Sequence, residues 1–222
     1  IEIIKNKENL GTSASRNIGI KKSKGDFILS LDDDCLLKPN LIKKYIKAYI
    51  ANPDYPGYIG LTSAPEPKTS FDKAICLSDM RHFFEIAKHK SEFFWGITAN
   101  LFLKSEAIGD ICFSSEHPKK GGGEDIAFCL EILKNHNYQG RRIFKCVPEA
   151  EVEHPYWNEN LSGYKRFLRW GYGDVVLHKR FPKYRFHHYP NLIEFTIIAL
   201  ILNLIIFSFF YTIPTSCWHP RR

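Results

Sequence analysis

The chain has 222 residues, of which 44% are hydrophobic and 25% charged, so intrinsic disorder and low-complexity sequence are excluded as its main character. Its formal net charge of +7 suits a phosphate-bearing ligand, an anionic membrane or a nucleic acid. The densest basic run, at residues 178–188, directly precedes a long apolar segment, which favours a membrane over a duplex. We therefore expect no nucleic acid partner.

Short β-like runs alternate with helix-like runs over the first 150 residues, which is typical of an α/β sheet protein. The pattern predicts strands at residues 1–5, 26–31, 58–62 and 141–147, and an extended stretch at 93–103. It predicts helices at residues 13–24, 39–50, 71–88 and 124–135. Loops rich in glycine or proline separate several of these segments.

The composition changes after residue 155. Residues 156–190 are aromatic and basic, and we interpret them as an interfacial segment. Residues 195–213 contain no charged side chain, and about 20 apolar residues span the roughly 30 Å core of a bilayer. We predict a transmembrane helix at 191–214 and a tail at 215–222, with a buried helix of a soluble domain as the alternative. The basic residues before the span predict that the α/β part of the chain lies on the cytoplasmic face.

An aspartate triplet, Asp32, Asp33 and Asp34, directly follows the strand predicted at residues 26–31. Ligands of open α/β sheets bind at the carboxyl ends of the strands. Adjacent carboxylates repel one another unless a cation or hydrogen-bond donors offset their charge, and a divalent ion can bridge them to a diphosphate. We favour a metal site here over an acidic turn that caps the next helix.

Small residues open the helix predicted at residues 13–24 and leave room for close approach of a ligand. Arg16 in this segment is suited to pairing with a phosphate. The alternative is a capped surface helix with a solvated arginine.

Three glycines at residues 121–123 deliver Glu124 and Asp125 to the first turn of another helix. A carboxylate on such a flexible loop can act as a general base, and Asp125 is our candidate. The alternative is stabilisation of the helix dipole by two acids, which contributes about 0.3–1 kcal/mol.

Two later motifs complete the set. His154 follows a late strand, where it is either a metal ligand or a structural histidine. Arg166 and Arg169 share a helix face beside Trp170, an arrangement that can hold a diphosphate or a glycan ring. The alternative is a basic amphipathic helix on lipid headgroups.

Taken together, these residues resemble the family 2 glycosyltransferases of GT-A fold. The resemblance is carried, in order over residues 1–170, by the segments SASRNIGIKKSKGDFILSLDDDC, GGGEDIAFCLEI, EVEHP and RFLRW. Two departures stand out: Cys35 occupies a position where the family often has a further aspartate, and the family's first strand is expected before Ile1. We accordingly expect an N-terminally truncated, membrane-anchored family member.

The resemblance implies a GT-A catalytic domain at residues 1–155, a Rossmann-like mixed sheet with flanking helices. It implies a metal-dependent inverting enzyme that transfers a hexose from a nucleotide-diphospho-sugar, a UDP-sugar, to a glycan or lipid-linked hydroxyl acceptor. Two rival hypotheses are a sugar-nucleotidyltransferase and a non-catalytic, membrane-tethered remnant of such an enzyme.

The resemblance also implies roles for individual residues. Asp125 would be the general base, with Glu124 beside it. Mn²⁺ or Mg²⁺ would be held by Asp34, Asp32 and His154. The donor side would comprise Arg16, Asn17, Asp32, Asp33, Arg166, Arg169 and Trp170. The acceptor side would comprise Trp95, Thr98 and Asn100.

Overall fold

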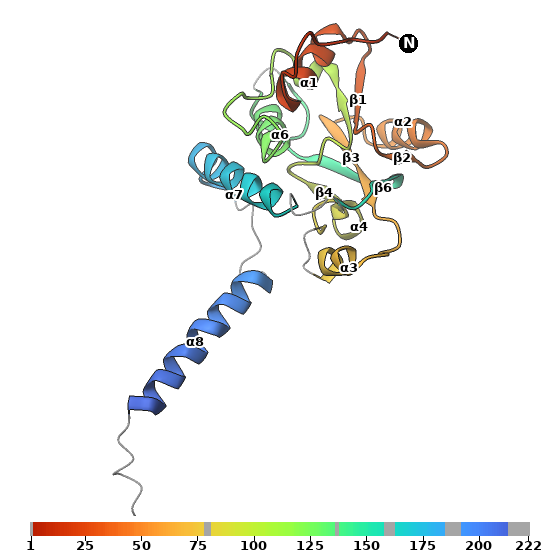
Figure 1. Ribbon diagram of the computed structural model, residues 1–222. Helices are drawn as coiled ribbons and strands as arrows, with labels where there is room; N and C mark the ends of the chain where they lie inside the picture. The colour runs from red at the N-terminus through yellow and green to blue at the C-terminus, as the bar shows by residue number, and fades with distance from the viewer. Residues whose placement is uncertain (1, 78–80, 136–137, 158–162, 185–191, 213–222) are drawn as a thin grey trace, which may run out of the picture.

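The computed structural model describes residues 2–77, 81–135, 138–157, 163–184 and 192–212. These residues form a mixed sheet with helices on both faces, and one further helix extends from the domain (Figure 1). The elements in chain order are α1 (Thr12–Lys22), β1 (Phe27–Leu31), β2 (Leu36–Leu37), α2 (Leu41–Ala51), β3 (Gly57–Ser63), α3 (Ser70–Leu77), α4 (Ile86–His89), β4 (Glu92–Phe93), β5 (Asn100–Lys104), α5 (Ser105–Ile108), α6 (Glu124–Lys134), β6 (Phe144–Glu153), α7 (Gly163–Arg180) and α8 (Leu192–Thr212).

The sheet has the strand order β1-β5-β3-β6-β2, and β4 pairs with β6 beside this path. Strand β5 is antiparallel to both β1 and β3, and β3 is parallel to β6. Strands β1, β3 and β6 therefore run in the same direction and end at one edge of the sheet. This edge carries Asp32, which follows β1, and His154, which follows β6, so the topology brings residues 122 positions apart in the chain to one place. The mixed sheet with flanking helices that the resemblance implies is confirmed.

Both faces of the sheet bury apolar side chains, as the alternation along β5 illustrates. Leu101 and Leu103 join the cluster that includes most of the buried face of α6. Phe102 points to the opposite face, where its ring stacks on Tyr45 of α2 with 4.9 Å between the centroids. Because successive strand residues face opposite sides, this pattern requires a helix on each face.

Three of the predicted elements need correction. Residues 2–5 form no strand, because no described strand pairs with them, and Ile3 is 87% exposed. The helix predicted at residues 71–88 is interrupted: α3 ends at Leu77 and α4 starts at Ile86. The strand predicted at 141–147 is longer and later, because β6 pairs with β3, β2 and β4 along its length.

Asn100 lies inside the sheet and satisfies three buried groups. Its Nδ2 donates to the carbonyl oxygens of Leu61 and Ala150 at 2.9 and 2.8 Å, and its Oδ1 accepts from the Tyr45 hydroxyl at 2.7 Å. Gly60 leaves room for this network, because a Cβ there would lie 2.2 Å from the Asn100 amide nitrogen. Asn100 is fully buried, and its polar groups face the interior of the domain.

We expect Asn100→Ala to lower the free energy of unfolding by about 2–4 kcal/mol. The substitution removes the amide from the carbonyls of Leu61 and Ala150, and it leaves the Tyr45 hydroxyl with only its longer contact, at 3.3 Å, to the backbone carbonyl of residue 100. Tyr45→Phe removes one donor from the same network and is expected to cost about 1 kcal/mol. Urea denaturation of both variants measures the two values. A loss below 1 kcal/mol for Asn100→Ala would contradict this role.

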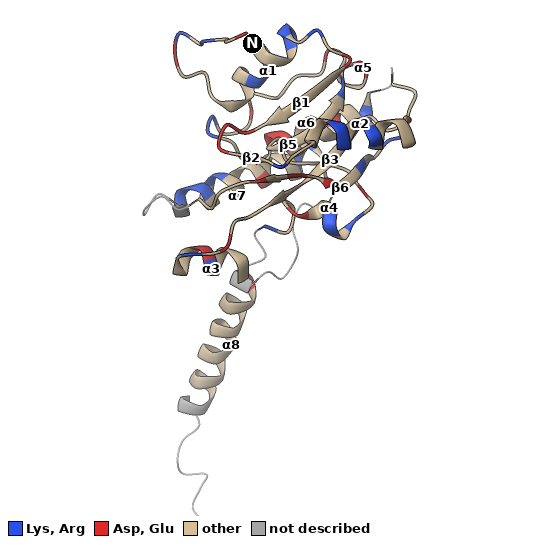
Figure 2. Ribbon diagram, turned by 90° about the vertical axis from the view of Figure 1, so that its right-hand side faces the viewer, with Lys and Arg blue, Asp and Glu red and all other residues tan. Residues whose placement is uncertain are grey.

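The last helix, α8, has 21 residues and stands away from the domain (Figure 1). Figure 2 shows most of its length without charged residues, and its apolar side chains are exposed, Leu204 by 69%. Among the described helices, none has the length and apolar character needed to cross a membrane. The transmembrane helix predicted at 191–214 therefore finds no support, and the tail predicted at 215–222 lies outside the described residues.

Candidate functional site

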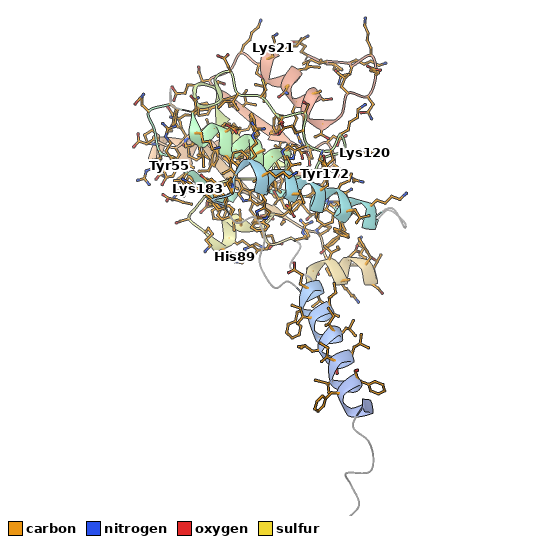
Figure 3. The ribbon with its side chains drawn as sticks, turned by 90° about the vertical axis from the view of Figure 1, so that its left-hand side faces the viewer. Lys21, Tyr55, His89, Lys120, Tyr172 and Lys183 are labelled. Atoms are coloured by element: carbon orange, nitrogen blue, oxygen red, sulfur yellow. The ribbon has the colours of Figure 1, made fainter. Side chains whose placement is uncertain are left out.

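A pocket of about 680 Å³ opens at the sheet edge where β1 and β6 end. Its walls come from α1, the ends of these two strands, the glycine loop before α6, and α7. Figure 3 shows α7, marked by Tyr172, next to the loop that carries Lys120. The predicted site residues that line the pocket are Arg16, Asp32, Asp33, Trp95, Thr98, Glu124, Asp125, His154, Arg166 and Trp170.

Asp32, Asp34 and His154 each offer one ligand atom, and these atoms lie within 4.8 Å of one another. The Nε2 atom of His154 is 3.6 Å from Asp34 Oδ1 and 3.8 Å from Asp32 Oδ2. Its Nδ1 lies 2.7 Å from the carbonyl oxygen of Pro155, a contact that requires the proton on Nδ1. That tautomer leaves the Nε2 lone pair for the carboxylate side, which is how histidine ligands of metals are oriented. Two carboxylates and one imidazole therefore fit a divalent ion such as Mn²⁺ or Mg²⁺.

Arg16 connects this cluster to the glycine loop. Its two terminal nitrogens donate to Asp32 Oδ1 and to Glu124 Oε1, both at 3.1 Å. Glu124 is buried, and its other oxygen accepts the backbone N–H of Gly122 at 2.6 Å. Arg16 thus engages one carboxylate oxygen of Glu124, and the glycine loop engages the other. Glu124 therefore positions the loop, and Asp125 is the better candidate for a base.

Asp125 is half-buried on the pocket wall, and its Oδ1 accepts the backbone N–H of Ile126 at 2.9 Å. Burial raises the pKa of the Asp125 carboxyl to about 7, and the adjacent Glu124 charge adds to this effect, while Arg16 opposes it. The position at a helix N-terminus predicts a lowered pKa, but desolvation outweighs it here. A carboxylate with this pKa is matched to proton transfer at neutral pH.

The predicted site residues that are not part of the pocket wall are Asn17, Asp34, Asn100 and Arg169. Asn17 exchanges two hydrogen bonds with the backbone of Phe113, at 2.9 and 2.8 Å, and so fixes the loop before the glycines. Asn100 belongs to the buried network described above. These positions give Asn17 and Asn100 structural roles in this structure.

Several wall residues were not among the predicted site residues. Asp174 lies four residues after Trp170 and hence on the same face of α7, a spacing that the sequence does contain. The aromatic residues of the wall have no comparable spacing in the sequence, because they come from a turn, a loop and a helix. They are Phe83, Phe84, Trp157 and Phe167.

Helix α7 packs closely on the glycine loop. Gly121, Gly122 and Gly123 all have positive φ, of 84°, 145° and 82°, a conformation that side-chain-bearing residues rarely adopt. At Gly173 of α7 an added Cβ would lie 2.1 Å from the carbonyl oxygen of Gly122. A larger residue at position 173 therefore cannot be accommodated without moving the helix off the loop.

We expect Gly173→Ala to lower the free energy of unfolding by about 1–3 kcal/mol through this overlap. Gly171→Ala is the matched control in the same helix, because nothing lies within 4 Å of a Cβ there. The control is expected to raise stability by about 0.5–1 kcal/mol, since alanine is the better helix former. Urea denaturation compares the pair, and equal effects of the two substitutions would contradict the close packing.

Comparison with known proteins points in the same direction as the geometry. Residues 1–95 match the family described as Glycosyl transferase family 2. A protein of Haemophilus influenzae described as "Uncharacterized glycosyltransferase" is 39% identical over 54 residues, which is 24% of this chain. The matched region spans 18% of that relative's length. Both findings support a glycosyltransferase, as the sequence predicts.

The family match includes Arg16 and the aspartate triplet but ends before Asp125 and His154. The roles of the two later residues therefore rest on the pocket itself, where the fold brings them to the matched part of the chain.

Proposed function

We propose that this chain is a metal-dependent, inverting glycosyltransferase. It transfers a hexose from a nucleotide-diphospho-sugar, a UDP-sugar, to a hydroxyl of a glycan or lipid-linked acceptor. The observation that carries the proposal is that one pocket contains both a candidate base and candidate metal ligands. Asp125, with a pKa suited to a base, lines the same pocket as Asp32 and His154, and Arg16 joins Asp32 to Glu124, the residue before Asp125.

In this proposal Asp32 and His154 form the donor side of the pocket, and Asp34, whose ligand atom lies within 4.8 Å of theirs, completes the metal cluster. A divalent ion bound by these residues would supply positive charge to the diphosphate leaving group. Arg16 and Lys120, on the same wall, are suited to hydrogen bonds with phosphate oxygens.

Asp125 performs the proton transfer in this proposal. It takes the proton of the acceptor hydroxyl as that oxygen forms a bond to the anomeric carbon of the donor. The bond from this carbon to the diphosphate oxygen breaks in the same displacement, and its electron pair leaves with the nucleoside diphosphate. Because the acceptor attacks from the side opposite the leaving group, the anomeric configuration is inverted.

The acceptor side is the aromatic part of the pocket. Trp170 offers a ring face on which a sugar ring packs. Trp95 and Thr98 lie in the pocket wall but are each only 4% exposed, and the Trp95 ring packs against Phe83. The Trp95 indole N–H is buried and has no hydrogen-bond partner among the described residues, so an acceptor hydroxyl would satisfy it.

A panel of nucleotide-diphospho-sugars tests the proposal. The full chain is incubated with each donor, a mixture of sugar and glycan acceptors, and Mn²⁺, and nucleoside diphosphate release is measured. Release that depends on acceptor supports the proposal. Release of pyrophosphate from a nucleoside triphosphate and a sugar phosphate would instead identify a sugar-nucleotidyltransferase, and no release from any donor would favour a non-catalytic chain.

We further propose that the chain associates with a membrane, with its catalytic domain on the cytoplasmic side. Helix α8 exposes apolar side chains whose removal from water contributes about 25 cal/mol per Å². Lys179 near the end of α7 is exposed and suited to anionic headgroups. The full chain should pellet with membranes after a high-salt wash, and recovery in the soluble fraction before any wash would contradict the association.

A further inference from the structure

A second pocket, of about 300 Å³, lies beside the candidate active site, and His82 lines both. It opens where the chain leaves β3, on the side of the domain marked by His89 in Figure 3. Its walls are formed by the loop after β3, by α3, by the segment leading into α4, and by a residue that follows β6. The wall residues with polar side chains are Glu66, Cys76, Arg81, His82, Glu85, His89 and Tyr156.

Arg81 is a buried cation without an ion pair among the described residues. It is 5% exposed, and its Nη2 donates to the carbonyl oxygens of Ser63 at 3.0 Å and Thr62 at 3.4 Å. Its Nε and Nη1 have no hydrogen-bond partner in the described part of the chain. The rings of Phe84 and Tyr156 flank the guanidinium, 5.0 and 5.6 Å from its central carbon. Carbonyls and ring faces offset only part of the cost of burying a charge. A buried charge is ordinarily paired with a group of opposite charge.

Two carboxylates line the same pocket, and the negative charge of Glu85 acts on Arg81 without forming an ion pair with it. Glu85 forms an ion pair with Lys88 at 2.8 Å, and Glu66 is exposed at the rim. The rings of His82 and His89 stack in parallel, with 5.4 Å between their centroids and 7° between their planes. Two imidazoles beside a guanidinium are suited to donating hydrogen bonds to oxygen atoms of an anion.

We propose that this second pocket is a binding site for an oxyanion, a carboxylate or a phosphate group, with Arg81 as its cation. The Nε and Nη1 atoms are covered in this structure, so binding turns the guanidinium toward the pocket and releases its longer contact to Thr62. If the proposed glycosyltransferase function holds, the shared His82 places the anion beside the acceptor, and the ligand is an acceptor with an acidic group. The pocket as an oxyanion site does not depend on that function.

Binding of inorganic phosphate to the full chain, without metal or donor, tests the site by calorimetry. Arg81→Lys keeps the charge but loses the planar fork, and we expect it to weaken binding by about tenfold or more. His89→Gln, at an exposed position that does not threaten folding, is expected to weaken binding by about two- to fivefold. Glu66→Gln removes a like charge from the rim and is expected to tighten binding by about two- to fivefold.

Lys90→Gln is the matched control, because it removes a positive charge from the same exposed segment at a residue that does not line the pocket. We expect it to bind phosphate as the wild type does. Phosphate can also pair with Arg16 in the larger pocket, so each titration is repeated in an Arg16→Gln background. Persistence of the phosphate site in that background, with the His82 and His89 ring signals shifting in NMR spectra, supports the proposal.

Glucuronate, glucose 6-phosphate and glucose distinguish a sugar-borne anion from a free one. Binding of the two acidic sugars but not of glucose supports an acidic acceptor, whereas binding of phosphate alone supports a site for a free anion. The proposal is overturned if Arg16→Gln protein shows no saturable phosphate binding, or if Arg81→Lys and His89→Gln both bind phosphate as the wild type does. Retained phosphate binding without any sugar transfer would count against the proposed function and leave the oxyanion site standing.

Discussion

Asp125→Asn is expected to lower turnover by about two to four orders of magnitude with little change in donor affinity. The amide has nearly the same shape as the carboxylate but cannot accept the acceptor's proton. The substitution should affect the chemical step and not the shape of the pocket. The reason is that Glu124, and not Asp125, makes the contacts that hold the glycine loop. Steady-state kinetics with the donor identified by the panel measure both parameters.

The pH dependence gives an independent check on the same residue. Because burial raises the Asp125 pKa to about 7, the wild-type carboxyl is protonated and inactive below this pH and ionised above it. Wild-type turnover should therefore rise as the pH increases through 7, and the residual rate of Asp125→Asn should not show this rise. Unchanged turnover in the variant, or a wild-type rate that is flat between pH 5.5 and 8.5, would remove Asp125 from the mechanism.

The raised pKa of Asp125 also makes the folding stability depend on pH. A carboxyl whose pKa is higher in the folded than in the unfolded chain binds its proton more tightly when folded, so its contribution to stability falls as the pH rises. Asp125→Asn cannot ionise and should be at least as stable as the wild type at pH 8. A variant that is far less active and at least as stable is the result expected when a catalytic carboxylate is held where burial disfavours its charge.

Asp34→Ala is expected to weaken Mn²⁺ binding by at least about 100-fold, because it removes one of three clustered ligands. Asp33→Ala is the matched control: it removes the same charge from the neighbouring position, but Asp33 is not part of the cluster. Electron paramagnetic resonance of Mn²⁺ measures the affinity of both variants without any donor. Equal weakening by the two substitutions would show that only general negative charge attracts the ion.

The strand and helix that carry the site could be predicted from the sequence, because each has a strong local signal. The apolar run before Asp32 ends abruptly in acids, and the three glycines before Glu124 mark the start of α6. The two-residue strands β2 and β4 could not be predicted, since so short a strand has no periodicity of its own and exists only through pairing with β6. For the same reason residues 2–5 look like a strand but have no partner in the described sheet.

The sequence predicts Asp125 as the base, but it does not show what the neighbouring Glu124 does. Glu124 and Asp125 are adjacent acids of similar chemistry, and only the fold shows that Arg16, 108 residues away in the chain, engages the first and leaves the second on the pocket wall. For Asn100 the sequence suggests a role in binding, and the fold shows a role in the core. A polar residue near a predicted acceptor strand suggests a ligand contact, yet its amide fills a gap in the core that arises where β3 and β6 shift register after Gly60.

The anomeric configuration of the product tests the central claim most directly. With an α-linked nucleotide-diphospho-sugar as donor, proton NMR of the newly formed glycoside distinguishes the two configurations. The single displacement proposed here, with Asp125 as the one base that activates the acceptor, predicts a β-linked product. An α-linked product would require retention of configuration and would contradict the account.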